Sequence, residues 1–275
     1  METAPFNLKR PYELSSAQVA QYRHDGHILL RNVVPPEEID RYRPIIKSFV
    51  ERGARSREIE TATGEKRSLF VQASNLWRKS ETIRELVFAE RFARLAAELM
   101  GVKAVRLYHD RAIVKEPGGV RTPWHKDHYN WPLATHHTVK MWLALVDISL
   151  EMGAMRFVSG THHSALFPEV RLSYDSEELF ERILRDRKIP IVSYTMRAGD
   201  ATFHWGETLH SALANSSSLR REVFAITYFA DGTLVMEPNH EHRRLDLGEF
   251  LPGLKGGDLV ATELNPLLYR MPEAG

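Results

Sequence analysis

The segment His125-Lys126-Asp127 carries two side chains that can bind one metal ion together. Residues at positions i and i+2 of an extended chain project to the same side, so the imidazole and the carboxylate can reach the same ion. Such a pair is common by chance in a chain with 13 histidines, and it needs a third ligand to form a site. The preceding segment is rich in turn-forming residues, which predicts that the pair lies at a strand start near the mouth of a barrel.

His210 is the best candidate for the third ligand. It lies at the far end of a predicted strand that begins at the turn Gly199-Asp200. Two histidines and one carboxylate, with open coordination positions, form the ligand set of non-haem Fe(II) oxygenases. Zinc hydrolases can use the same donors, so the ligand set alone does not decide the metal.

Arg221 distinguishes between these two classes of enzyme. It lies at the start of a strongly apolar predicted strand, 222–230, and on an antiparallel barrel it would point inward near the metal. A guanidinium fork there matches a carboxylate bidentately, and a 2-oxo acid needs such a partner for the carboxylate that does not chelate the iron. Arg221 therefore favours an iron oxygenase, with Arg220 as the alternative anchor if the strand register shifts by one.

The elements that must position these residues fall into two classes along the chain. Helical periodicity predicts helices beginning at Ser15, at 35–36 and over 81–99, with a short strand at 27–34 and an exposed polar loop over 51–67. After residue 101, short apolar segments predict strands at 102–114, 138–148, 155–158, 189–195, 200–205 and 222–230. Both alternating sets of residues in 138–148 are apolar, which predicts a strand buried on two faces. Many short strands separated by turns indicate a barrel or a sandwich.

The predicted organisation is a single domain over residues 1–275. A helical N-terminal part of about 1–100 would support a barrel core of about 101–232, followed by an extension over 233–275. A capping-box pattern at 175–178 predicts a helix in an insertion over 171–188, which fits a lid and a surface helix equally well. His240 and His242 lie in the extension, where the Pro and Arg content favours a solvated loop.

The composition excludes several other classes of protein. The 275 residues include no cysteine, which excludes disulfides, thiolate nucleophiles and Cys-based metal sites. The 37 basic and 36 acidic side chains nearly balance, so no nucleic-acid partner is expected. No stretch approaches the ~18 apolar residues of a membrane span, and the first nine residues lack the apolar core of a signal peptide. We therefore expect a cytoplasmic protein without a membrane partner, either a monomer or a homodimer.

Several motifs together resemble the phytanoyl-CoA dioxygenase family. They comprise the segments 124–132, 139–147, 153–162 and 209–216, the latter followed by Arg221, and the N-terminal pattern of 25–27 with 32–34. The resemblance covers about residues 15–232. It implies a mainly β protein with flanking helices, whose core is a double-stranded β-helix (a jelly-roll or cupin-like barrel). It also implies Fe(II), 2-oxoglutarate and O₂ as cofactor and co-substrates, with ascorbate as the reductant in vitro.

The resemblance also implies roles for individual residues. His125, Asp127 and His210 would bind iron, and Arg221 would bind the distal carboxylate of 2-oxoglutarate. Trp142 would line the co-substrate pocket, and Thr138 would help to bind the co-substrate.

One position departs from the family pattern. Many members carry a hydroxyl residue two positions after the distal histidine, where this chain has Ala212, and Ser211 or Thr208 would have to supply that hydroxyl. The halogenases of the family lack the metal-binding carboxylate, so the presence of Asp127 favours hydroxylation.

The expected substrate is a small organic molecule, such as a natural-product intermediate, oxidised with release of succinate and CO₂. Candidates for its pocket are Tyr129, Trp131, Trp205 and His109. The sequence shows no basic patch strong enough for an acyl-CoA. Three alternatives remain open: use of the same oxidant for cyclisation, desaturation or epimerisation, a zinc-dependent hydrolase or isomerase, and a cupin-like binding protein without turnover.

Overall fold

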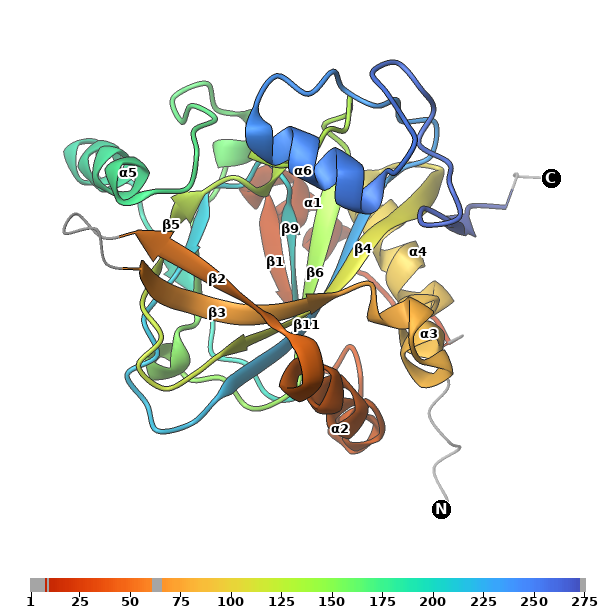
Figure 1. Cartoon of the computed structure of the whole chain (residues 1–275), viewed down its shortest axis with the longest axis horizontal. Helices are drawn as coiled ribbons and strands as arrows, with labels where there is room; N and C mark the ends of the chain where they lie inside the picture. Colours follow the sequence, from red (N-terminus) through yellow and green to blue (C-terminus); the bar gives the residue numbers. More distant parts are fainter. Residues whose placement is uncertain (1–7, 9, 61–65, 273–275) are drawn as a thin grey trace.

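The computed structural model describes Leu8, residues 10–60 and residues 66–272. Two antiparallel sheets form the centre of the molecule (Figure 1). The larger has eight strands in the order β1-β9-β6-β11-β4-β3-β2, with β12 also paired to β4, and the smaller has four in the order β5-β10-β7-β8. A cavity is lined by residues of both sheets.

The bounds of the elements are as follows. The larger sheet contains β1 (His27–Leu30), β2 (Arg55–Glu60), β3 (Lys66–Ser74), β4 (Ala104–Lys115), β6 (Thr138–Ala144), β9 (Ala201–Trp205), β11 (Arg221–Ala230) and β12 (Leu267–Arg270). The smaller sheet contains β5 (Thr122–His125), β7 (Met155–Phe157), β8 (Val192–Ser193) and β10 (His210–Ala212). The α-helices are α1 (Ser16–Asp25), α2 (Pro36–Gly53), α3 (Glu81–Val87), α4 (Glu90–Met100), α5 (Tyr174–Arg187) and α6 (Glu241–Phe250). Short 3₁₀ turns are η1 (Leu76–Arg78), η2 (Asp127–Tyr129), η3 (Leu150–Met152) and η4 (Thr161–His163).

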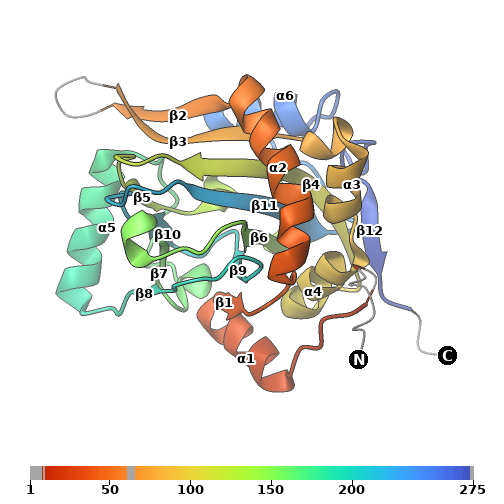
Figure 2. The ribbon, with the colours of Figure 1, turned by 90° about the horizontal axis from the view of Figure 1, so that it is seen from below.

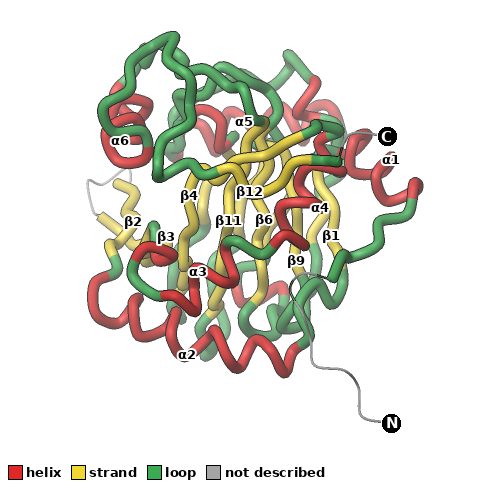
Figure 3. The backbone as a smooth tube through the Cα atoms, turned by 90° about the vertical axis from the view of Figure 1, so that its right-hand side faces the viewer, coloured by secondary structure: helices red, strands yellow, loops and turns green. Residues whose placement is uncertain are grey.

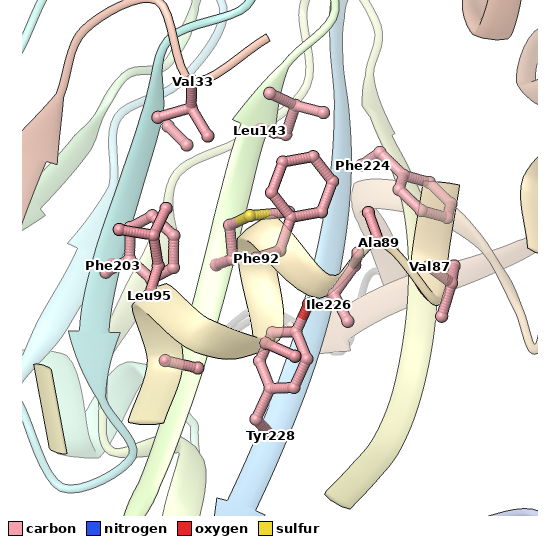
Figure 4. Packing of buried hydrophobic residues seen from close by; sticks show 14 of the residues in the cluster. Val33, Val87, Ala89, Phe92, Leu95, Leu143, Phe203, Phe224, Ile226 and Tyr228 are labelled. Carbon is pink, nitrogen blue, oxygen red and sulfur yellow. The ribbon is translucent and has the colours of Figure 1, made fainter. Parts of the chain in front are cut away.

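The N-terminal helices cover the outer face of the larger sheet (Figure 3). In α4, apolar residues recur at helical spacing, and Phe92 and Leu95 lie against Phe203 of β9 and Ile226 of β11 (Figure 4). Full burial of each such side chain contributes about 1.5–3 kcal/mol to folding. This layer therefore fixes the larger sheet from behind and leaves its inner face available for the cavity.

Strand β6 is buried on both faces, as its composition predicts. Val139, Met141 and Leu143 belong to the core under the helices, whereas Trp142 and Ala144 belong to a second cluster between the sheets. Because successive side chains of a strand point to opposite faces, Lys140 shares the inner face with Trp142. One strand thus serves both the core and the cavity.

Several predicted elements are confirmed with adjusted ends. The first helix begins after Ser15, whose side chain forms a capping box with Gln18. The segment predicted as one helix over 81–99 forms two helices, because Ala89 is extended and begins α4. Helix α5 begins after Ser173, which forms its capping box with Ser176, slightly earlier than the pattern at 175–178.

The polar segment 51–67 is not a loop. Helix α2 continues to Gly53, and β2 and β3 then form a hairpin that extends the larger sheet beyond β4 (Figure 2), while residues 61–65 lie outside the described part. Only Ile59 of β2 is buried. Backbone pairing and charged side chains are typical of an edge strand, which explains why the apolar periodicity of a strand is absent there.

Two more expectations about the chain path were wrong. His210 does not end the strand that begins after Gly199-Asp200, because β9 stops at Trp205 and His210 begins β10 in the other sheet. The segment 240–242 is also not a loop: it caps and begins α6, which lies across one end of β4 and β6 (Figure 1), and β12, later in the extension, pairs with β4. Within the described ranges, no helix has the length and apolar character needed to cross a membrane. Apart from Leu8, the first nine residues lie outside these ranges.

Candidate active site

The three predicted metal ligands come together at the inner end of the cavity. His125, the last residue of β5, lies opposite His210, the first residue of β10, and their ring centroids are 4.2 Å apart. Lys126 is extended, which brings Asp127 at the start of η2 to the same point. One ligand atom from each of the three residues lies within 4.8 Å of the others. The pair therefore lies at a strand end and not at the strand start that the sequence predicts.

Backbone carbonyls orient both imidazoles. Nδ1 of His125 is 2.8 Å from the carbonyl oxygen of Pro123, and Nδ1 of His210 is 2.9 Å from that of Thr208. Because a carbonyl can only accept, each Nδ1 carries the proton and each Nε2 presents its lone pair. An outer hydrogen bond that fixes the tautomer in this way is the usual arrangement of metal-binding histidines.

Two further side chains hold the carboxylate of Asp127. The Lys140 ammonium and Nε2 of His204, the latter at 3.3 Å, both donate to Oδ2. Oδ1 lies 3.9 Å from Nε2 of His125. The carboxylate is thus oriented by contacts that do not require a metal.

The protonation states also suit a metal. Burial and the neighbouring His210 lower the pKa of His125 to about 3, and burial lowers the pKa of His210 to about 3. Burial alone would raise the pKa of Asp127, but Lys140 and the histidines hold it well below its usual range. Neutral imidazoles beside an ionised carboxylate are the forms that bind a divalent cation. The residues present therefore fit a 2-His-1-carboxylate metal site.

Arg221 lines the same cavity, and its side chain is buried. It donates to the carbonyl oxygen of Gly153 and lies over the ring of Trp142 at 5.1 Å, whereas its Nε has no hydrogen-bond partner among the described residues. Burial lowers the pKa of Arg221 to about 9. A buried guanidinium without a carboxylate partner in the described chain is a site for an anionic ligand.

Arg220 points elsewhere. It is 42% exposed and donates to Glu116 at 2.8 Å on the outside of the molecule. The register of β11 thus directs the side chain of Arg221 into the cavity and that of Arg220 to the surface.

The cavity has a volume of about 690 Å³. Of the residues predicted for the co-substrate and substrate pockets, Trp142 and Trp131 line it. Ser211 also lines it, and its hydroxyl accepts from Arg156 Nε at 2.9 Å. Thr208 instead donates to the backbone carbonyl of Gly26 at 2.7 Å, so of these two candidates Ser211 is the one that lines the cavity.

Four other predicted residues do not line the cavity. Thr138 lies beyond Lys140 on β6, next to Gly206 and Trp131, because it is at the far end of the strand. Trp205 packs against Tyr22 under the helices, Tyr129 stacks on His240 at 4.2 Å, and His109 packs against Phe250 at 4.6 Å. Trp205 belongs to the core under the helices, so it projects from the opposite face of its strand. Thr138 and His109 lie beyond the parts of β6 and β4 that border the cavity, and Tyr129 lies in η2 and not on a strand.

Most of the outer wall of the cavity was not predicted from the sequence. Arg55 and Arg57 of β2, Arg111 of β4, and His242, Arg244 and Asp246 of α6 all line it. The expectation that the segment 240–242 is a solvated loop is therefore wrong: His240 caps α6, and His242 faces the cavity. The sequence feature that could have indicated this helix is His240 as a capping residue, followed by the helix-forming residues of 241–247.

Helix α5 does not close the cavity. It lies along β5, where the backbone N–H and the Nε1–H of Trp124 donate to Glu177 and Glu181 at 2.6 and 2.9 Å. Only Leu172, just before the helix, reaches the cavity lining. The covering element is α6, from the C-terminal extension.

A second cluster of possible ligands lies outside the cavity lining. His128 is 3.3 Å from Glu169 and 3.9 Å from Glu207. However, Arg243 pairs with Glu169 at 3.1 Å and His136 pairs with Glu207 at 2.7 Å. These carboxylates already have cationic or hydrogen-bonding partners, so the cluster is an ion-pair network.

Comparison with known proteins agrees with this geometry. The family model of phytanoyl-CoA dioxygenase (PhyH) matches residues 22–223. A probable alpha-ketoglutarate-dependent hypophosphite dioxygenase of Stutzerimonas stutzeri is 24% identical over 226 residues, which is 78% of each chain.

Two solved structures extend the likeness over nearly the whole chain. The non-heme alpha-ketoglutarate-dependent carbocyclase SnoK from nogalamycin biosynthesis is 27% identical, with a TM-score of 0.78 over 96% of this chain and 99% of its own. The epimerase SnoN, solved in complex with Fe³⁺, alpha-ketoglutarate and nogalamycin RO, is 26% identical, with a TM-score of 0.77 over 92% and 98%. These neighbours confirm the double-stranded β-helix with flanking helices. The chain is an oxidoreductase and belongs to the phytanoyl-CoA dioxygenase family.

Proposed function

We propose that this dioxygenase oxidises a small organic molecule in the 690 Å³ cavity, with Fe(II) held by His125, Asp127 and His210 and 2-oxoglutarate anchored by Arg221. The observation that carries the proposal is the preoriented His/Asp/His set in one cavity with a buried, unpaired guanidinium. A zinc hydrolase would have no use for that guanidinium, and a protein that only binds would have no use for the metal ligands.

The chemistry supplied by Fe(II) and 2-oxoglutarate together is oxidation of a C–H bond by O₂, with 2-oxoglutarate converted to succinate and CO₂. The chain contributes position and protection from water. Carbonyls behind His125 and His210 keep both Nε2 atoms directed at the metal, and Lys140 keeps Asp127 ionised. Trp131 and Trp142 form an apolar wall of the cavity, which would exclude water from the reacting C–H bond.

The resulting product is proposed to be hydroxylated, since Asp127 retains the carboxylate ligand. The likeness to a carbocyclase and an epimerase supports a second candidate, in which the same oxidant is used to close a ring or to invert a stereocentre, the latter with ascorbate as the reductant because the substrate is not oxidised. The mass of the product distinguishes them: hydroxylation adds one oxygen atom, ring closure removes two hydrogen atoms, and epimerisation leaves the mass unchanged.

The central test is iron-dependent formation of succinate. Protein purified without O₂ is mixed with Fe(II), ascorbate and 2-oxoglutarate, O₂ is admitted, and succinate is quantified. We expect slow succinate formation that falls sharply in Arg221→Ala and persists in the matched variant Arg220→Ala, whose side chain lies outside. Protein that binds zinc but no Fe(II), or no metal, would contradict the proposal.

A further inference from the structure

The cavity carries more positive charge than its proposed cofactors use. Its lining includes Lys140 and five arginines, against three carboxylates, Asp127, Asp246 and Glu249, a formal excess of three. Divalent iron and the dianion of 2-oxoglutarate together add no net charge, so the excess remains once both are bound. This argument rests on the proposed function and extends it to the substrate.

Arg111 lies on a strand next to the one that carries Arg221. It belongs to β4, on the inner face of the larger sheet, and its guanidinium lies over the ring of Phe250 at 5.1 Å. Its Nε is buried and has no hydrogen-bond partner among the described residues. Because the ring covers one face of the guanidinium, the N–H edge is the part that remains for a ligand.

Arg57 approaches the same region from the β2–β3 hairpin. It is partly buried, and no ion pair or hydrogen bond of its side chain is found in the described part of the chain. Burial and the neighbouring charges of Arg111 and Arg171 lower its pKa. Like charges held together away from water cost free energy unless an anion joins them.

The nearby acid does not supply that anion. Asp246 accepts a hydrogen bond from the hydroxyl of Tyr108 at 3.2 Å and is not within ion-pair distance of Arg57 or Arg111. Burial raises the pKa of Asp246 to about 6, and Arg111 and Arg57 act to lower it. Asp246 therefore interacts with both guanidinium groups through space without bonding either of them. The two guanidinium groups thus face the cavity without a bonded counter-ion.

We propose that Arg57 and Arg111 bind an anionic group of the substrate, a carboxylate or a phosphate, at the outer end of the cavity beneath α6. The remainder of the substrate would extend past Trp131 toward His125 and Asp127. The basic patch that the linear sequence does not display is thereby formed by residues from β2, β4 and α6. Two fixed guanidinium groups would also set which C–H bond of the substrate faces the metal site.

The test compares three probes that share a naphthalene ring and differ in the charge of one substituent: 1-naphthol, 1-naphthoate and 1-naphthyl phosphate. Each is titrated calorimetrically into protein loaded without O₂ with Fe(II) and saturating 2-oxoglutarate, so that Arg221 is already occupied. Wild-type protein is expected to bind the preferred anion at least about tenfold more tightly than 1-naphthol, with weaker binding at high salt. The ratio of the two anions identifies the carboxylate or the phosphate as the favoured group.

Single variants then locate the anion. Arg57→Gln and Arg111→Gln are each expected to weaken binding of the preferred anion about tenfold or more and to leave 1-naphthol within about twofold. Arg111→Lys, which keeps the charge, should recover part of the affinity. Arg185→Gln removes the same charge from the exposed surface of α5 and should leave the affinity for all three probes unchanged.

Binding of Fe(II) and of 2-oxoglutarate is measured first, in wild type and in each variant. If wild-type protein binds neither Fe(II) nor 2-oxoglutarate, the proposed function fails. If both bind and the three probes have equal affinity, or if the variants weaken 1-naphthol as much as the anions, the anion site is refuted. Normal 2-oxoglutarate binding by Arg111→Gln also shows that this variant is folded.

Discussion

The inner and outer ends of the cavity are built in different ways. At the inner end, His125, Asp127 and His210 lie on the paired strands β5 and β10 or next to them, and local backbone carbonyls orient the rings. At the outer end, Arg57, Arg111 and the residues of α6 come from segments far apart in the chain. The part that performs chemistry therefore depends on local geometry, whereas the part that would recognise a substrate depends on how distant segments pack.

The largest expected effect is at the inner end. His210→Ala removes a direct ligand and should lower the affinity for Fe(II) by more than the roughly 10- to 100-fold that loss of an outer partner costs. Equilibrium titration of Fe(II) without O₂ measures this change. His136→Ala, on the exposed surface, is the matched control. Unchanged affinity in His210→Ala would show that the three residues do not form the metal site.

Arg221→Gln should raise the dissociation constant for 2-oxoglutarate about 100-fold, because a buried charge-assisted contact is worth roughly 1.5–3 kcal/mol. The measurement is a titration of 2-oxoglutarate into iron-loaded protein. The adjacent exposed residue provides the control Arg220→Gln, expected to match wild type within about twofold. An equal loss of 2-oxoglutarate affinity in both variants would contradict the assignment of Arg221 to the cavity and Arg220 to the surface.

Lys140→Met tests whether the side chain that hydrogen-bonds Asp127 supports metal binding. It removes the ammonium that bonds Asp127 and should weaken Fe(II) binding roughly 10- to 100-fold. The same substitution at the exposed Lys103 should have no effect. If Lys140→Met binds Fe(II) as wild type does, His204 alone suffices to orient the carboxylate.

The smallest expected effect is at the outer end and depends on pH. Burial raises the pKa of Asp246 to about 6, above the value of about 3.9 in an unfolded chain, so the folded form retains this proton more readily. The contribution of Asp246 to stability should therefore fall as the pH rises from about 4 through 6. Asp246→Asn cannot ionise and should be more stable at pH 7 by on the order of 1 kcal/mol, with no gain at pH 4. Urea unfolding at both pH values measures this, and Fe(II) affinity should not change.

The two ends also differ in what the sequence could predict. His125, Asp127 and His210 have side-chain types that limit their possible roles, and the alternating apolar residues of β6 fix which face holds Trp142. Physical constraints of this kind act over a few residues. They predicted the His/Asp/His cluster, the buried arginine and the two-faced strand, although not the sheet in which His210 lies.

The outer end could not be predicted in the same way. Strand β2 is recognised only by its pairing with β3, because a polar edge strand has no apolar periodicity. Helix α6 buries only Arg243 and Phe250, so its sequence lacks an apolar stripe. Trp205 and Tyr129 were placed in the pocket by closeness in sequence to the predicted ligands, which does not determine where a side chain projects. Thr138 was placed there by the family resemblance alone.

The weak burial of α6 has a consequence for how the protein can change. The segment that carries this helix begins after β11 ends at Ala230 and returns to β12, which pairs with β4, the neighbour of β11. Since both ends of the segment are held on adjacent strands, the sheet fixes the ends of this loop, and Phe250 at the end of the helix anchors it against Tyr108 of β4. His242 and Arg244 line the cavity and lie outside the apolar cluster of Phe250 and Tyr108. Exchanging them would therefore change the lining of the cavity without removing an apolar core contact.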